Sequence, residues 1–178
     1  MNTYKDELSR SMEYLAASEK TFFIGQAVSY QGTAMRGTLE NVNEKKLLEM
    51  PVEEDFQMGV ANGLALQGYI PISIFPRWNF LLLATNQIVN HLNCLGELTG
   101  LKTPPKVIIR TSVGSETPLH PGPQHVGDFT EAFRQLCPNL EIINLQEKSL
   151  IFPSYEKALC RTDGVSTLLV EWGDKYGQ

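Results

Sequence analysis

The sequence lacks an excess of positive charge and lacks long apolar runs. There are 15 lysine and arginine residues against 20 aspartate and glutamate residues, which gives a net charge of −5 at pH 7 and a pI near 5.2. Nucleic acids and anionic membranes bind basic surfaces, so neither is expected as a partner. The amino terminus lacks the apolar core of a signal peptide, and runs such as Phe80–Ala84 are too short to span a bilayer. We therefore expect a soluble, cytoplasmic protein.

Cysteine and the common catalytic motifs are scarce as well. Cys94, Cys137 and Cys160 are odd in number and far apart, which is typical of reduced thiols in a cytosolic protein. The sequence contains no G-x-x-x-x-G-K-[ST] loop, no G-x-G-x-x-G after a strand and no Gly-x-Ser-x-Gly turn. These absences leave the common nucleotide-binding and hydrolase functions without support.

What the sequence does contain is an alternation of short apolar runs with longer segments of helical spacing. Strands are expected at Thr21–Gly25, Ile70–Phe75, Lys106–Arg110, Glu141–Leu145 and Ser166–Trp172. Helices are expected at Lys5–Ser18, Glu53–Gln67, Asn79–Leu98, Asp128–Leu136 and Ser154–Arg161. Because strands that alternate with helices form a parallel sheet covered on both faces, we predict a three-layer α/β/α fold with a mainly parallel sheet. A length of 178 residues suits a single domain.

Two further patterns concern how this domain meets its surroundings. Gly59 and Gly63 stand four apart on the expected helix Glu53–Gln67, so one face of that helix is open to close packing. Packing within the domain and a contact between subunits both fit this spacing, and the first is the more common. The segment Thr111–Gly127 is rich in Gly, Pro, Ser and Thr and directly follows a strand. It predicts a long loop at the end of the sheet where ligands bind.

Three segments carry residues that could bind a ligand or react. Met50–Asp55 places three acids in the first turn of a helix, where the helix dipole alone already favours them. His120–His125 holds two histidines in a rigid loop, where they could transfer protons or simply be solvated, and further metal ligands at suitable spacing are not evident. Phe75–Phe80 supplies aromatic rings that fit either a core or a platform for a flat ligand. Taken singly, each segment has a structural explanation at least as good as the functional one.

Taken together, these segments resemble the beta subunit of the decarboxylating component of 2-oxoacid dehydrogenases and, more distantly, the central domain of transketolases. The resemblance runs over nearly the whole chain and depends on the order and spacing of short motifs. These are Gly25 with Tyr30–Gly32, Pro51–Glu54 with Gly59 and Gly63, Asn79–Phe80 with Asn86–Asn90, Ile109–Thr111, and Gly122–His125. The resemblance implies the thiamine-diphosphate-binding fold, with residues 1–178 forming a single pyrimidine-binding domain.

The resemblance also implies roles for four residues. Glu54 would hydrogen-bond the N1′ nitrogen of the aminopyrimidine of thiamine diphosphate, which favours the imino tautomer that deprotonates the thiazolium C2. Phe80 would pack on the pyrimidine, and Val52 would line the same pocket. His125 would face the substrate. Catalysis is thus assigned to Glu54 and His125, cofactor binding to Glu54, Phe80 and Val52, and no metal ligand is assigned to this chain.

A partner is implied by what the resemblance leaves out. The family holds the diphosphate and magnesium through another domain, marked by Gly-Asp-Gly and Asn-Asn, and this sequence has neither motif. We therefore expect a second subunit that carries them and, by the family's habit, a heterotetramer. The family's beta subunit continues into another domain after the strand that matches Ser166–Trp172, and that domain is expected to be absent here. Gln26 and Ala27 stand where acids are common in the family.

The implied function is that of one subunit, inactive alone, of a thiamine-diphosphate-dependent enzyme acting on a 2-oxo acid or a ketose. Decarboxylation of 2-oxo acids, acyloin formation and ketol transfer all fit. The alternative is a catalytically silent interaction or regulatory module that retains the fold, although the joint presence of Glu54, Phe80 and His125 speaks against it. A free-standing binding domain of flavodoxin-like type would need a phosphate cradle at a strand–helix turn, and the sequence offers none that is convincing.

Overall fold

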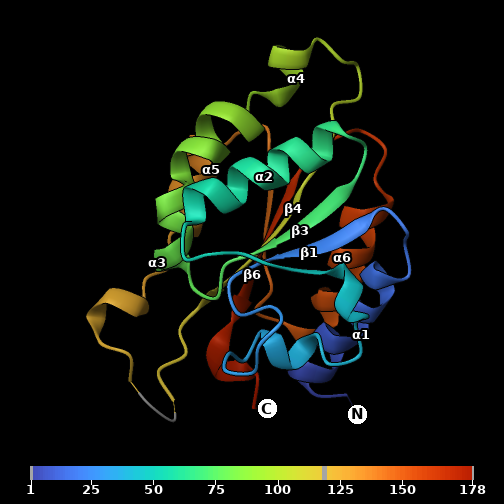
Figure 1. Cartoon of the computed structure of the whole chain (residues 1–178). Coiled ribbons are helices and arrows are strands. Elements are labelled where there is room, and N and C mark those ends of the chain that lie inside the picture. The colour runs from blue at the N-terminus through green and yellow to red at the C-terminus, as the bar shows by residue number, and fades with distance from the viewer. Residues whose placement is uncertain (1, 118–119, 178) are drawn as a thin grey trace.

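A parallel sheet forms the centre of the molecule. The computed structural model describes residues 2–117 and 120–177, and these form one six-stranded sheet in the order β2-β1-β3-β4-β6-β5, with every neighbouring pair parallel (Figure 1). The strands are β1 (Thr21–Gly25), β2 (Leu47–Glu49), β3 (Ile70–Ile74), β4 (Ile108–Val113), β5 (Glu141–Asn144) and β6 (Thr167–Trp172). The predicted α/β fold is confirmed.

Helices cover both faces of this sheet. They are α1 (Tyr4–Ala16), α2 (Glu54–Leu66), α3 (Trp78–Leu81), α4 (Leu95–Thr99), α5 (Thr130–Leu136) and α6 (Ile151–Cys160). Figure 1 shows α2, α3 and α5 on one face and α1 and α6 on the other. In the part of the chain that the structure describes, no helix combines the length and the apolar character needed to cross a membrane.

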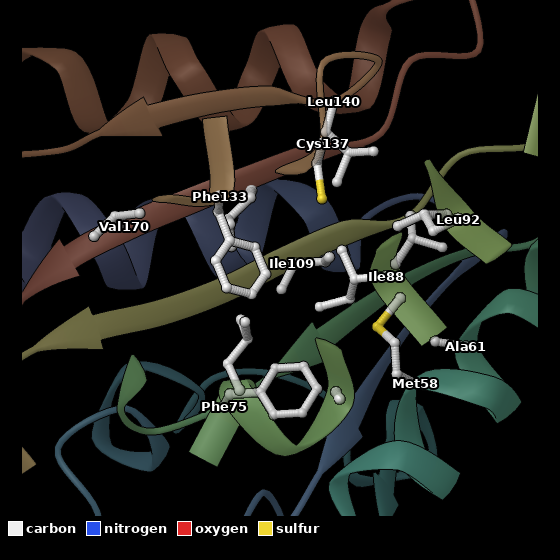
Figure 2. Close-up of a cluster of buried hydrophobic side chains, with 14 of the residues drawn as sticks. Met58, Ala61, Phe75, Ile88, Leu92, Ile109, Phe133, Cys137, Leu140 and Val170 are labelled. Carbon is white, nitrogen blue, oxygen red and sulfur yellow. The ribbon is translucent and has the colours of Figure 1, made fainter. Parts of the chain in front are cut away.

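Two apolar cores hold the three layers together. Met58, Phe75 and Phe133 are fully buried in the core between the sheet and the helices α2 and α5 (Figure 2). Leu8 and Tyr155 are fully buried in the core between the sheet and the helices α1 and α6. Each fully buried side chain of this size contributes about 1.5–3 kcal/mol to folding. Burial on both faces explains why the strands read as continuous apolar runs instead of alternating patterns.

The prediction of one continuous helix over Asn79–Leu98 is wrong. The segment contains α3, a 3₁₀ turn at Leu82–Ala84, a π-helical stretch at Gln87–Leu92 and then α4. Ile88 and Leu92 do face the core, so the apolar period was real. Its hydrogen bonding differs from that of an α-helix. The Asn93 N–H donates to the carbonyl of Ile88, five residues back, at 2.8 Å. The Asn62 side chain donates to the Gln87 carbonyl at 3.2 Å.

Other boundaries also shift. β2 is only three residues long and was not predicted as a strand; it lies parallel to β1 at one edge of the sheet. β4 continues to Val113, so the loop that follows it is shorter than the predicted Thr111–Gly127. The helix expected from Ser154 already begins at Ile151.

The strand order creates a crevice. β1 lies between β2 and β3, so the chain leaves β1 toward one edge of the sheet and returns to its other side with β3. In parallel sheets, ligands bind outside the carboxyl ends of the strands at such a switch point. The segments that follow β1, β3, β4 and β6 meet there.

Candidate active site

A cavity of about 370 Å³ lies at the carboxyl ends of the central strands. Its lining residues come from the segments 26–35, 76–80, 112–115 and 173–176, which follow β1, β3, β4 and β6. A second cavity of about 690 Å³ adjoins it and shares lining residues with it, among them Thr33, Ser115 and Tyr176. Cavities of this size hold small ligands.

Glu54 is a buried carboxylate beside this cavity. It is the first residue of α2 and is only 4% exposed. Its Oε1 accepts a hydrogen bond of 2.8 Å from Nε2 of Gln26, which itself lines the cavity. Its Oε2 has no hydrogen-bond partner within residues 2–117 and 120–177, yet it is not among the atoms closed off from solvent. One oxygen is therefore fixed and the other is open.

The position of Glu54 is set by its helix. Gln57, one turn further along α2, is fully buried, and its Nε2 donates to Ser73 Oγ at 3.0 Å and to the Ile74 carbonyl at 3.0 Å. These bonds tie the first turn of α2 to β3. The positive end of the helix dipole also favours a negative charge at Glu54.

Phe80 and His125 are brought together from different segments. Their ring centroids lie 5.4 Å apart with planes tilted by 44°. Phe80 belongs to α3 and lines the cavity, whereas His125 ends a 3₁₀ turn at Pro123–His125 in the loop after β4. Among the described residues the buried Nδ1 of His125 has no partner. Nε2 of the same ring is not among the atoms closed off from solvent, so it is the ring nitrogen that a ligand can reach.

The loop that carries His125 is anchored at both ends. Nη1 of Arg77 donates to the His125 carbonyl at 3.0 Å and to the Ser115 carbonyl at 3.4 Å. Oδ1 of Asp174 accepts from the backbone N–H groups of Glu116 at 2.9 Å and Thr117 at 3.0 Å, and from the Thr117 hydroxyl at 2.7 Å. Burial acts to raise the pKa of Asp174, but these hydrogen bonds and the charge of Arg77 outweigh it and hold that pKa below its usual range.

Only some of the site residues predicted from the sequence lie together at the cavity. Phe80 lines the cavity and contacts His125, and Glu54 adjoins it through Gln26. Val52 lies on the surface with 78% of its area exposed, so in this chain alone it lines no enclosed pocket. Within the described ranges, His, Cys, Asp and Glu side chains do not gather in threes as a metal site requires.

Sequence reasoning gave no role to Arg77 and saw in Gln26 only a missing acid. Gln26 directly follows β1 and Arg77 is the third residue after β3, and positions just after the strands of a switch point are a signal for ligand-facing residues in parallel sheets. Their contacts could not be read from spacing, because Gln26 meets a residue 28 positions away and Arg77 one 48 positions away.

Comparison with known proteins finds a matching family model and several relatives. The family model described as "Transketolase, pyrimidine binding domain" matches residues 4–172. The human mitochondrial pyruvate dehydrogenase E1 component subunit beta is 28% identical over 146 residues, which cover 80% of this chain and 40% of that protein. The corresponding subunit of Gracilaria tenuistipitata var. liui is 30% identical over 134 residues, covering 74% of this chain and 41% of its own length. The chain thus spans less than half the length of these relatives.

Solved structures agree with the fold. A structure titled "Split gene transketolase, inactive beta4 tetramer" superposes with a TM-score of 0.69 at 14% identity, covering 96% of this chain and 51% of that one. A putative thiamin diphosphate-dependent enzyme from Mycobacterium smegmatis gives a TM-score of 0.62 at 13% identity, covering 96% of this chain and 31% of that one. At such identities the likeness concerns the fold alone.

Proposed function

Because this chain belongs to the transketolase pyrimidine-binding domain family, we propose that it is one subunit of a heteromeric thiamine-diphosphate-dependent enzyme. The observation that carries the proposal is the buried Glu54 carboxylate, with Oε1 held by Gln26 and Oε2 open. Burying a carboxylate is costly, so an oxygen left without a donor is a place for a ligand to supply one.

The residues present fit an aminopyrimidine. A flat ring with polar nitrogens needs a partner for a ring nitrogen, which the open oxygen of Glu54 offers. It also needs an apolar face, which Phe80 offers on the cavity wall. Val52, exposed just before α2, would complete the pocket once a partner covers it.

The chemistry divides between the cofactor and this chain. When bound, thiamine diphosphate supplies a nucleophilic carbon that attacks a carbonyl group. Glu54 would hold or release a proton at Oε2 toward the ring, while the bond from Gln26 keeps its other oxygen in place. His125, whose ring packs on Phe80, would exchange a proton with the substrate through Nε2, which, unlike the buried Nδ1, is not closed off from solvent.

A partner subunit would complete the site. Val52 is 78% exposed and Phe56, one turn further along, is 53% exposed, although large apolar side chains usually avoid solvent. Gly63 on the same helix has open space where a side chain would stand, whereas Gly59 is covered by the Gln87 side chain at 3.6 Å. Thus Gly59 serves packing within the domain and Gly63 is free for a subunit contact. We propose that this partner holds the diphosphate and magnesium, in a heterotetramer.

The reaction class follows the relatives. Two of them are named as pyruvate dehydrogenase E1 beta subunits, which supports a 2-oxo acid as substrate here, and the family model is named for transketolase, which supports a ketose. The proposal includes decarboxylation, acyloin formation and ketol transfer as reactions. It also includes a cytoplasmic location and the assignment of residues 1–178 to a single domain.

The test is to co-purify the chain with its partner from its native cells and assay the assembly with thiamine diphosphate and magnesium. Glu54→Gln should lower turnover by about 100-fold or more, because proton transfer by a positioned side chain is worth about 10²–10⁴ in rate. Glu53→Gln is the matched control, since Glu53 is exposed and makes no capping bond with its side chain. A silent module would show no turnover that depends on Glu54, and full activity of Glu54→Gln would refute the proposal.

A further inference from the structure

The cavity beside Glu54 carries a single charge. Among its described lining residues, Arg77 is the only one with a charged side chain, and the others are polar or apolar, such as Gln26, Ser112 and Phe80. We infer that Arg77 makes this site selective for a substrate with an anionic tail, a carboxylate or a phosphate that is not the reacting group. The inference rests on the proposed function, which leaves the substrate open.

Arg77 has donors to spare for such a group. Both bonds to loop carbonyls, at His125 and Ser115, come from Nη1. Nε and Nη2 have no hydrogen-bond partner within the described residues, and neither is closed off from solvent. A guanidinium carries five N–H groups in a planar fork, so three remain for a ligand.

The fork is also held in place before a ligand arrives. The two carbonyl bonds of Nη1 fix one end of the guanidinium between Ser115 and His125, and that reduces the entropy lost on binding. The remaining N–H groups on Nε and Nη2 lie along one edge, which matches two oxygens of a carboxylate or phosphate.

The neighbouring charges leave room for an anion. The adjoining cavity is lined by Lys5, Glu40 and Asp174 among its charged residues. The charge of Arg77 helps to lower the pKa of Asp174, and Oδ1 of Asp174 already accepts three hydrogen bonds from Glu116 and Thr117. That carboxylate is therefore committed to the loop, and Arg77 keeps an edge for the substrate.

Binding to the chain itself is the first test, because the cavity is formed by this chain. The ¹⁵N–¹H signal of Arg77 Nε would be followed by NMR while glutarate, inorganic phosphate or the uncharged glutaramide is added. We expect glutarate or phosphate to shift the signal and glutaramide to leave it unchanged, and the stronger of the two anions identifies the kind of tail. Equal responses to glutarate and glutaramide, or none to either anion, would overturn the inference.

The assembled enzyme gives the second test. With 2-oxoglutarate and its 5-amide, whose tail is uncharged, as a matched pair, and a ketose phosphate with its ketose as another, Arg77→Gln should lower kcat/KM for the member with the anionic tail by about 10- to 100-fold. It should change the member with the uncharged tail less than about twofold, and Arg134→Gln on the surface of α5 should change neither. Equal losses for both members would mean that Arg77 only holds the loop. Absence of all turnover would count against the proposed function, while the NMR result still decides the role of Arg77.

Discussion

Two buried glutamates, Glu171 and Glu54, sit in opposite electrostatic settings. Glu171 on β6 is fully buried, and its two oxygens accept hydrogen bonds from Arg110 at 2.7 and 3.1 Å and from the hydroxyls of Tyr155 and Tyr176. Burial alone would lower the pKa of Arg110, but the adjacent Glu171 carboxylate raises it, so the guanidinium stays charged. Glu171 has no oxygen left for a ligand.

Glu54 is almost as deeply buried, with 4% of its area exposed, but it has one donor, from Gln26. The difference is that both oxygens of Glu171 are occupied by donors, whereas Glu54 keeps one oxygen without a donor among the described residues. A buried charge is tolerated when every lone pair is satisfied, and one that is left incomplete costs stability unless a ligand completes it. The same residue type thus completes a buried hydrogen-bond network on one side of the sheet and, on the other, keeps an oxygen that the proposed cofactor would occupy.

The largest effect on stability is expected at Glu171, whose oxygens are both occupied by donors. Glu171→Gln leaves the buried Arg110 without its counter-charge, and breaking such a pair on one side costs about 3–5 kcal/mol. The measurement is the free energy of unfolding from urea denaturation. The matched variant Glu54→Gln should change that free energy by less than about 1 kcal/mol, because Oε2 is open and an amide oxygen still accepts a bond from Gln26. Equal losses at both sites would erase the distinction.

A smaller effect on stability is expected from Gln26, which, within the described part of the chain, donates the one hydrogen bond that Glu54 accepts through its side chain. Gln26→Ala removes the bond to Oε1 of Glu54 and should cost about 1 kcal/mol, since water can reach the vacated space. In the assembled enzyme it should lower kcat more than it raises KM, because Glu54 would lose its orientation toward the cofactor. Gln135→Ala, at an exposed position of α5, is the control. An unchanged kcat would show that Gln26 does not position Glu54.

Periodicity predicted the fold well where the pattern was local. Strands such as Thr21–Gly25 and the helix from Glu54 could be predicted because burial on both faces and the 3.6-residue period are written in the sequence. The mixed helix types of the stretch 79–98 could not, because contacts such as that between Asn62 and the Gln87 carbonyl join residues 25 positions apart. β2 could not either, since three residues carry no usable period.

The site shows the same division. Glu54, Phe80 and His125 are named as site residues from motif order, and the structure brings the rings of Phe80 and His125 into contact. Nothing in the sequence tells that Gln26 bonds Glu54, because that contact depends on how the loop after β1 folds back over the start of α2. The sequence also does not show that Val52 is exposed, because exposure depends on which segments cover the start of α2.

The smallest effect should be local and should extend the comparison to a third carboxylate, Asp174, which is satisfied like Glu171 but lies near the surface. Asp174→Ala, which removes the accepting oxygen, should speed hydrogen exchange at the amides of Glu116 and Thr117 while the global free energy of unfolding changes by less than about 1 kcal/mol. Because the pKa of Asp174 is lowered in the folded chain, its contribution is present above the unfolded pKa of about 4 and is lost as pH falls through the folded value. The parent chain should therefore lose protection at these two amides only below about pH 4, after correction for intrinsic exchange rates. Protection that is equal in parent and variant at pH 7 would mean that Asp174 does not hold the loop.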